Sequence, residues 1–199
     1  MIIHNFDQRS DEWHNIRLGK FTGSNFHSFM KPSETRKRLI LEKTAELITG
    51  ISQSKRIVTD DMQRGIDLED EAILAYELTT GNIVEKVGFI EKDKYTGCSP
   101  DGLVGSDGII EAKSPKDSVY IKQVISKKID PVYYTQMQYN LFISERVWCD
   151  YIAYNVNFNP YIVRYERDEP YIKEISIVLD QCIREVEENI KIFNERRIK

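Results

Sequence analysis

The chain has 199 residues, 41% of them hydrophobic and 30% charged, which suits one packed domain over residues 1–199 and excludes a disordered chain. No apolar run approaches the roughly 20 residues that a membrane-spanning helix needs, so we expect no membrane partner. The formal net charge of −4 argues against a general nucleic-acid binder, although a basic groove on an acidic protein can still accept DNA.

The first part of the chain predicts mainly helices. We expect them over residues 11–18, 22–30, 33–49 and 59–80. Ser33 is a typical cap for the third helix, and Gly50 ends it. Thr59 caps the fourth, whose first turn is acidic and which ends at Gly81.

The second part predicts a small sheet between helices. We expect strands near residues 83–91, 98–104, 108–114, 147–155 and 161–166, and helices over 117–128, 130–143 and from 170 onward. Asp130 as cap and Pro131 at the first helical position begin the second of these helices. The outline is α+β and resembles an α/β/α arrangement, with a small mixed central sheet flanked by helices.

The strands around residues 98–114 carry the clearest chemistry. Asp101 lies in a turn-prone Pro-Asp-Gly segment, and alternation along the next strand places Glu111 and Lys113 on one face. Two carboxylates suit Mg²⁺, which prefers oxygen ligands, and a neighbouring lysine can hold or deprotonate a metal-bound water. Such a set can cut a phosphodiester. The motif alone is also compatible with a solvated hairpin that carries a surface Glu–Lys pair.

Glu69 is the second candidate in the predicted helix over 59–80. Its neighbours at helical spacing, from Met62 to Tyr76, are all apolar, so the carboxylate is expected within a buried stripe. A buried carboxylate without a partner costs several kcal/mol, and a metal or Lys113 would remove that cost. The alternative is a glutamate at the edge of the stripe that pairs with an arginine.

Arg17 and the hydroxyls that follow it suggest an anion site. Arg17 lies one helical turn after Trp13, and Thr22 and Ser24 present hydroxyls next to a predicted helix N-terminus. Ordinary helix capping beside a surface arginine is the alternative.

Two glutamines on the 130–143 helix are flanked by apolar residues. The amides of Gln136 and Gln138 can bond a phosphate oxygen or a lysine without adding charge. Capping of neighbouring backbone groups is an equally open role for both.

Charge is distributed unevenly along the chain. Residues 1–58 carry a balance of +4, and residues 59–116, which contain the proposed metal site, carry −7. The basic first third can therefore supply phosphate contacts. The three cysteines are far apart and match neither a disulfide framework nor a metal cluster, and residues 1–7 lack the features of a signal peptide. We expect a reducing, cytoplasmic setting.

Five short motifs occur in the order that one nuclease family shows. They are Trp13-x3-Arg17-Leu18-Gly19-x2-Thr22-x-Ser24, Gly65-x3-Glu69-x2-Ala72, Cys98-Ser99-Pro100-Asp101-Gly102-Leu103, Glu111-Ala112-Lys113 and Gln136-x-Gln138-Tyr139. From about residue 12 to the closing helix, the chain resembles the lambda-exonuclease-like, YqaJ-type viral recombinases of the PD-(D/E)xK nuclease superfamily. Each motif alone is weak evidence for this family, but five motifs in the same order at compatible spacings are strong evidence.

The resemblance implies a restriction-endonuclease-like core and a Mg²⁺-dependent 5′→3′ exonuclease on double-stranded DNA, which leaves a 3′ single strand for recombination. Asp101, Glu111 and Glu69, with the Ala112 carbonyl, would hold metal. Mn²⁺ would substitute for Mg²⁺, with two ions per site. Lys113 would position the attacking water.

The resemblance also implies a pocket for the 5′-terminal phosphate. Its residues would be Arg17, Ser24, Ser99 and Gln136, with Gln138 as a further candidate. Met62 stands where the family has an apolar strand-splitting wedge, and Glu91 stands where it has a further acid. The implied assembly is a homotrimeric ring around a DNA end, with a single-strand annealing protein as partner.

Two other functions stay open. A restriction-type or structure-specific endonuclease of the same superfamily would cut covalently closed circles, which an end-dependent exonuclease leaves intact. A non-catalytic DNA-binding or assembly subunit would show no digestion stimulated by Mg²⁺, and it would have no need for a buried acid.

Overall fold

Eight strands form two sheets in the computed structural model, which describes residues 1–53 and 58–197. The larger sheet has the order β2-β5-β6-β7-β8, and the smaller has the order β1-β3-β4. The larger sheet consists of β2 (Val84–Glu85), β5 (Gly102–Val104), β6 (Gly108–Lys113), β7 (Trp148–Ala153) and β8 (Tyr161–Glu166). The smaller consists of β1 (Ile2–His4), β3 (Phe89–Glu91) and β4 (Gly97–Cys98). Strand β6 pairs in parallel with β7, and the other pairs are antiparallel, so the sheet is mixed as expected.

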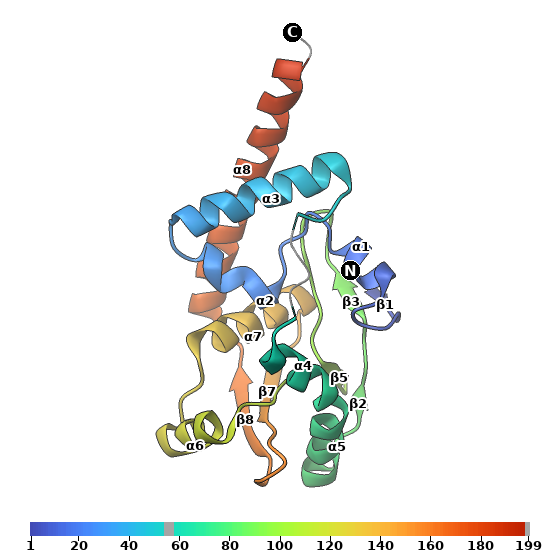
Figure 1. Cartoon of the computed structure of the whole chain (residues 1–199), viewed down its shortest axis with the longest axis vertical. Coiled ribbons are helices and arrows are strands. Elements are labelled where there is room, and N and C mark those ends of the chain that lie inside the picture. Colours follow the sequence, from blue (N-terminus) through green and yellow to red (C-terminus); the bar gives the residue numbers. More distant parts are fainter. Residues whose placement is uncertain (54–57, 198–199) are drawn as a thin grey trace.

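The helices occupy both faces of the larger sheet (Figure 1). They are α1 (Asp11–Ile16), α2 (Gly23–Phe26), α3 (Glu34–Thr49), α4 (Asp60–Asp67), α5 (Glu69–Thr80), α6 (Asp117–Ser126), α7 (Pro131–Ser144) and α8 (Glu169–Arg197), with a 3-10 turn at His27–Phe29. The expected α+β fold is confirmed.

Alternation along β6 divides the core into two layers. Ile109 packs in the large cluster with residues of α2, α3, α7 and α8, whereas Ile110 packs with Ile73 and Tyr76 of α5 on the opposite face. Because side chains alternate across a strand, Glu111 lies on the same face as Ile109, toward α7. The expected sidedness of this strand is therefore confirmed.

Several predicted helix ends are also confirmed by their capping contacts. Ser33 accepts a hydrogen bond from the backbone N–H of Arg36, and Gly50 ends α3 with a φ of 68°. Asp130 accepts one from Val132 N–H, with Pro131 in the first turn. These caps satisfy N–H groups that a helix start leaves without partners.

Four expected elements are wrong in detail. The helix predicted over 59–80 is two helices, α4 and α5, because the backbone at Leu68 turns to φ −101° and ψ 0°. The strand predicted over 83–91 is two strands, β2 and β3, that belong to different sheets, and the strand over 98–104 divides likewise into β4 and β5. The helix predicted over 22–30 is the short α2 followed by the 3-10 turn.

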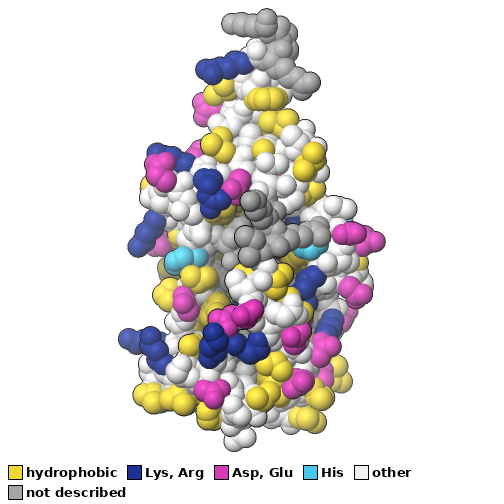
Figure 2. All heavy atoms as spheres, viewed as in Figure 1, with side chains coloured by type: hydrophobic (Ala, Val, Ile, Leu, Met, Phe, Trp, Pro, Cys, Tyr) yellow, Lys and Arg dark blue, Asp and Glu magenta, His cyan; other side chains and the backbone are white. Residues whose placement is uncertain are grey.

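The closing helix α8 runs past the body of the protein, and α3 lies across it (Figure 1). Arg36 of α3 bonds Glu185 of α8 at 2.6 Å. Figure 2 shows acidic and basic side chains intermingled on the face that it views. No helix within residues 1–53 and 58–197 combines the length and apolar character needed to cross a membrane.

Candidate active site

Strand β6 carries Glu111 to the centre of a hydrogen-bonded network. Its side chain is 1% exposed and forms an ion pair with Lys113, two residues along the same strand. Two amides of α7 complete the network: Gln136 Nε2 donates to Glu111 Oε1 at 2.6 Å, and Asn140 Nδ2 donates to Oε2 at 3.3 Å. The carboxylate is therefore held from both sides by polar groups.

Asp101 is positioned by the backbone of the paired strand. The N–H of Ala112 donates to Asp101 Oδ2 at 2.7 Å, and the N–H of Asp101 donates to Ile110 O at 3.2 Å. In a strand, the N–H and C=O of one residue face the same edge, so the Ala112 carbonyl faces the side on which Asp101 lies. This carbonyl is thus available to a ligand bound beside Asp101.

Burial and mutual repulsion govern the charge of these groups. Burial raises the pKa of Asp101 above its ordinary value, and the charges of Glu111 and Glu69 raise it further, against Lys113. Burial also raises the pKa of Glu111, with Lys113 acting in the opposite sense. Burial lowers the pKa of Lys113, but Glu111 and Asp101 outweigh that effect and raise it above the ordinary lysine value. Lys113 is therefore an ammonium group here and not a base.

Glu69 is the first residue of α5, next to the break at Leu68. Its side chain is 15% exposed and pairs with Arg9, the kind of partner that the alternative interpretation named. Within α4, Ile66 of the expected stripe is half-buried, but Met62 is 58% exposed, so the stripe does not extend to Met62. The charge of Glu69 nevertheless raises the pKa of both Asp101 and Glu111, so it lies close enough to act on them.

The donor set fits a hard divalent cation in its chemistry. Glu111 is buried and Asp101 is half-buried, and a cation between these two acids would relieve their repulsion. The Ala112 carbonyl adds a neutral oxygen. Within the described part of the chain, however, no three His, Cys, Asp or Glu side chains are grouped closely enough to hold a metal ion. Glu69, the third acid of the expected metal site, is paired with Arg9.

Arg17 lies in a second polar cluster. Its guanidinium donates to Ser99 Oγ at 3.2 Å, to Thr22 Oγ1 at 3.2 Å and to Ser24 Oγ at 3.3 Å. It stacks on Trp13 at 3.9 Å from the ring centroid, and the indole N–H of Trp13 donates to Ser99 Oγ at 2.9 Å. Burial lowers the pKa of Arg17 to about 10, so the group stays positive at neutral pH. A fixed cation among three hydroxyls is suited to an anion such as a phosphate.

One cleft of about 1180 Å³ joins the two clusters. Candidate residues that line it are Arg17, Ser24, Met62, Glu69, Asp101, Ala112, Lys113 and Gln136. Ser99 contacts Arg17 directly, and Glu111 lies beneath Gln136 and Lys113. Residues distributed from position 17 to 136 are thus brought together at one site.

Two candidates lie outside this cleft. Gln138 is buried, donates to Glu166 O at 2.9 Å and accepts from the N–H of Asp168 at 2.9 Å, which is the backbone role named as its alternative. Glu91, at the end of β3, bonds His4 at 3.1 Å and Lys20 at 2.9 Å. Both side chains have structural partners where they are.

Sequence reasoning missed Arg9 and Asn140. Asn140 lies four residues after Gln136, and this helical spacing places both on one face of α7, so it offered a signal. Arg9 lies in the turn before α1, where no periodicity indicates its direction.

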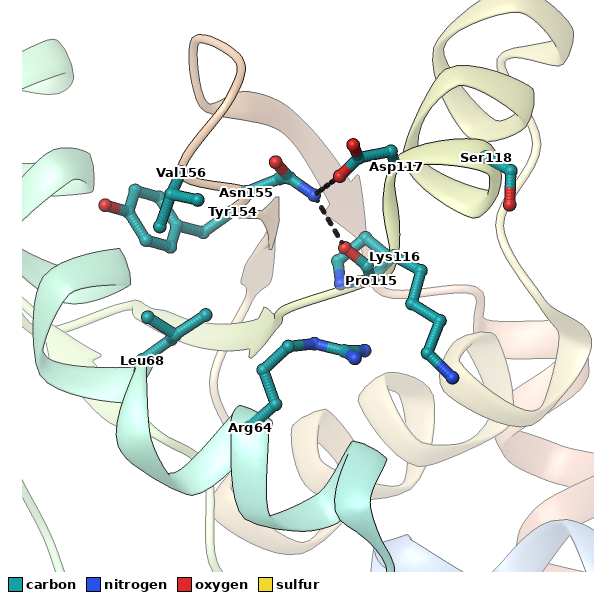
Figure 3. A pocket seen from close by; sticks show the side chains of 9 residues that line it. All are labelled: Arg64, Leu68, Pro115, Lys116, Asp117, Ser118, Tyr154, Asn155 and Val156. Atoms are coloured by element: carbon teal, nitrogen blue, oxygen red, sulfur yellow. Dashed lines mark hydrogen bonds between the residues drawn. The ribbon is translucent and has the colours of Figure 1, made fainter.

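A smaller cavity of about 460 Å³ borders the cleft (Figure 3). The two share Arg64, Pro115 and Lys116 in their linings. Asp61 bonds both Arg64, at 3.0 Å, and Lys116, at 2.9 Å, so one carboxylate offsets part of the positive charge of this shared wall. The dashed contacts in Figure 3 run from Asn155 to Asp117 and to the Pro115 carbonyl. This cavity is therefore a structural junction between α4 and the start of α6.

A model of the YqaJ-like viral recombinase domain matches residues 12–147. The chain is similar to an alkaline exonuclease (LHK-Exo) from Laribacter hongkongensis, with 32% identity and a TM-score of 0.88 over 95% of this chain and 98% of that one. The complex of LHK-Exo with dAMP matches over the same shares with 32% identity and a TM-score of 0.87. A phage-related exonuclease from Haemophilus somnus 129PT shares the fold, with 18% identity and a TM-score of 0.64 over 87% of this chain and 96% of that one. No curated protein matches the chain.

Proposed function

Since the chain belongs to the family of YqaJ-like viral recombinase domains, we propose that it is a nuclease that digests one strand of linear double-stranded DNA in the 5′→3′ direction. The product is a duplex with a 3′ single-stranded tail for recombination or strand annealing. The observation that carries the proposal is the cleft that joins the two clusters: Asp101 and Lys113, with Glu111 bonded to Lys113, lie beside the Arg17 cluster. The similar LHK-Exo is an alkaline exonuclease.

The acid pair supplies the metal site of this proposal. Asp101, Glu111 and Glu69, with the Ala112 carbonyl, would hold Mg²⁺, or Mn²⁺ in its place, with two ions per site. When bound, the metal lowers the pKa of a coordinated water and offsets negative charge on the phosphate that is attacked. Lys113, an ammonium group beside Glu111, orients that water and adds positive charge at the scissile phosphate.

The Arg17 cluster supplies the polarity of digestion. Arg17, Ser24 and Ser99 bind the 5′-terminal phosphate, and Trp13 keeps the guanidinium in place from beneath. Gln136 lies between the two clusters, where its amide contacts Glu111 and faces the cleft. Because the strand end is gripped at a fixed separation from the acid pair, only the bond next to that end is presented for hydrolysis. The complex of LHK-Exo with dAMP, a deoxynucleoside monophosphate, supports a nucleotide ligand for this cleft.

Further parts of the proposal rest on the family. A homotrimeric ring around the DNA end would explain processive digestion, and a single-strand annealing protein would receive the 3′ tail. Met62, exposed at the cleft, is the proposed wedge that separates the strands. The proposed setting is the cytoplasm.

One assay tests the activity and its direction. Linear and covalently closed circular duplex DNA are incubated with the full chain and Mg²⁺, with each end of the linear substrate labelled separately. We expect early release of the 5′ label as mononucleotide, retention of the 3′ label and intact circles. Cutting of circles would indicate an endonuclease. No digestion with either Mg²⁺ or Mn²⁺ would indicate a non-catalytic subunit.

A further inference from the structure

Arg9 has a backbone conformation that arginine rarely adopts. It lies in the turn between β1 and α1 with a φ of 72°, in the left-handed region. A residue with a Cβ atom is strained there by about 1–2 kcal/mol, whereas glycine is not. Backbone strain of this kind is often retained where the strained residue has a functional role.

The side chain of Arg9 reaches across the cleft rim to Glu69. It is 41% exposed, lines the cleft and donates through Nη2 to Glu69 Oε2. The two residues are 60 positions apart in the chain, so only the tertiary fold brings them together.

The ion pair with Arg9 occupies Glu69, the third acid of the proposed metal site. The charge of Glu69 acts on Asp101 and Glu111, yet no three acidic side chains are grouped closely enough for an ion in the described part of the chain. A divalent ion bound by Glu69 would compete with the guanidinium for this carboxylate. The apparent affinity of a site for an ion falls when only a fraction of the protein molecules have the site free to bind it.

We propose that Arg9 is an internal counter-cation that occupies Glu69 until a divalent ion takes its place, and that it thereby sets the ion concentration at which the active site fills. This rests on the proposed role of Glu69 in holding metal. Arg9 is a positioning residue in this scheme, since it acts through Glu69.

Calorimetric titration of the full chain with Mn²⁺, without DNA, tests the inference. Arg9→Gly removes the cation and accepts the left-handed backbone, so the fold is preserved and can be checked by thermal unfolding. We expect its Kd for Mn²⁺ to fall by about two- to tenfold, the range that breaking a partly exposed ion pair allows. Arg9→Lys keeps a cation near Glu69 and should stay closer to wild type.

A matched control uses the next acid on the same helix. Lys86 pairs with Asp70, both well exposed and outside the cleft lining, so Lys86→Gln should leave the Kd unchanged. Equal or weaker Mn²⁺ binding by Arg9→Gly would overturn the role of Arg9.

The variant Asp101→Asn tests whether the proposed metal site binds Mn²⁺, independently of the role of Arg9. If Asp101→Asn loses Mn²⁺ binding while Arg9→Gly equals wild type, only the role of Arg9 fails. If wild type and Asp101→Asn bind Mn²⁺ alike, the proposed metal site itself is wrong, and the inference is overturned with it.

Discussion

The backbone N–H of Ala112 donates a 2.7 Å hydrogen bond to the carboxylate of Asp101. This bond forms just beyond the paired part of β5, where β6 continues alone on that side. It holds the acid from one strand beside the acid and lysine of the next. The consequence is a pair of acids, Glu111 buried and Asp101 half-buried, whose repulsion Lys113 offsets only in part, so that protonation or a cation stabilises them.

Asp101 should make the stability of the metal-free protein depend on pH. Burial and the charge of Glu111 raise its pKa in the folded state to about 8, so between about pH 4 and pH 8 the folded protein keeps a proton that the unfolded chain has lost. The free energy of unfolding therefore falls as pH rises through this window. We expect Asp101→Asn to be more stable than wild type at pH 8 in EDTA, with a smaller gain at pH 5.

Urea denaturation at the two pH values measures this difference. Asp107→Asn, at the exposed turn of the same hairpin, serves as the control and should show no gain that grows with pH. A loss of stability in Asp101→Asn at pH 8 would contradict the prediction.

Lys113→Ala should abolish cutting while DNA binding survives. The substitution removes the ammonium group that pairs with Glu111 at the cleft, and we expect cleavage to fall about 100-fold or more. Digestion of an end-labelled duplex with Mg²⁺ and binding with Ca²⁺ are measured in parallel. Lys173→Ala, an exposed lysine of α8, is the control. Near-wild-type turnover in Lys113→Ala would show that cleavage does not require Lys113.

Arg17→Ala should slow digestion by different factors on duplexes with a 5′-phosphate and with a 5′-hydroxyl. The guanidinium is held by three hydroxyls and would make charge-assisted bonds to a terminal phosphate, worth roughly tenfold or more in rate. We expect a larger loss on 5′-phosphorylated than on 5′-hydroxyl duplex, measured as initial rates. Lys37→Ala, an exposed cation of α3, should affect both substrates equally. Equal losses for Arg17→Ala would argue against a phosphate clamp.

Gly23→Ala should disturb the amides that hold Glu111. A Cβ atom at Gly23 would lie 2.4 Å from Asn140 Oδ1 and 3.1 Å from the Gln136 carbonyl, so the Asn140 side chain must move. We expect a loss of about 1–3 kcal/mol in the free energy of unfolding, together with slower cleavage. Gly65→Ala is the stability control, because nothing lies within 4 Å of its added carbon. Unchanged stability and rate in Gly23→Ala would refute this packing argument.

Asp150→Ala should destabilise the protein on the face of the sheet opposite the cleft. Asp150 is buried, accepts from Tyr76 Oη at 2.7 Å and accepts two bonds of 2.8 Å from Arg164. Removing it leaves the phenol O–H of Tyr76 without its acceptor and the partly exposed guanidinium without its carboxylate, at about 3 kcal/mol. Tyr76→Phe removes one bond and should cost about 1 kcal/mol. Urea unfolding measures both, and equal effects would contradict this ranking.

Local patterns in the sequence predicted the parts of the fold that depend on neighbouring residues. Alternation placed Ile109 and Glu111 on one face of β6, and capping residues such as Ser33 and Asp130 marked helix starts. The prediction of one helix over 59–80 was wrong because the apolar positions of α4 and α5 fit one continuous helix. Periodicity does not indicate the change of backbone direction at Leu68. The division of 83–91 and 98–104 between two sheets likewise depends on pairing partners elsewhere in the chain.

The sequence by itself determined that Asp101, Glu111 and Lys113 lie together, because a short hairpin and the two-residue period of a strand leave little freedom. It did not determine the pairing of Glu69 with Arg9, or that Gln138 turns to the backbone while Asn140 reaches Glu111. Those contacts join residues 60, 28 and 29 positions apart, and helix packing decides which side chains meet. Periodicity reports the face on which a residue lies, whereas only the packed structure decides what that face touches.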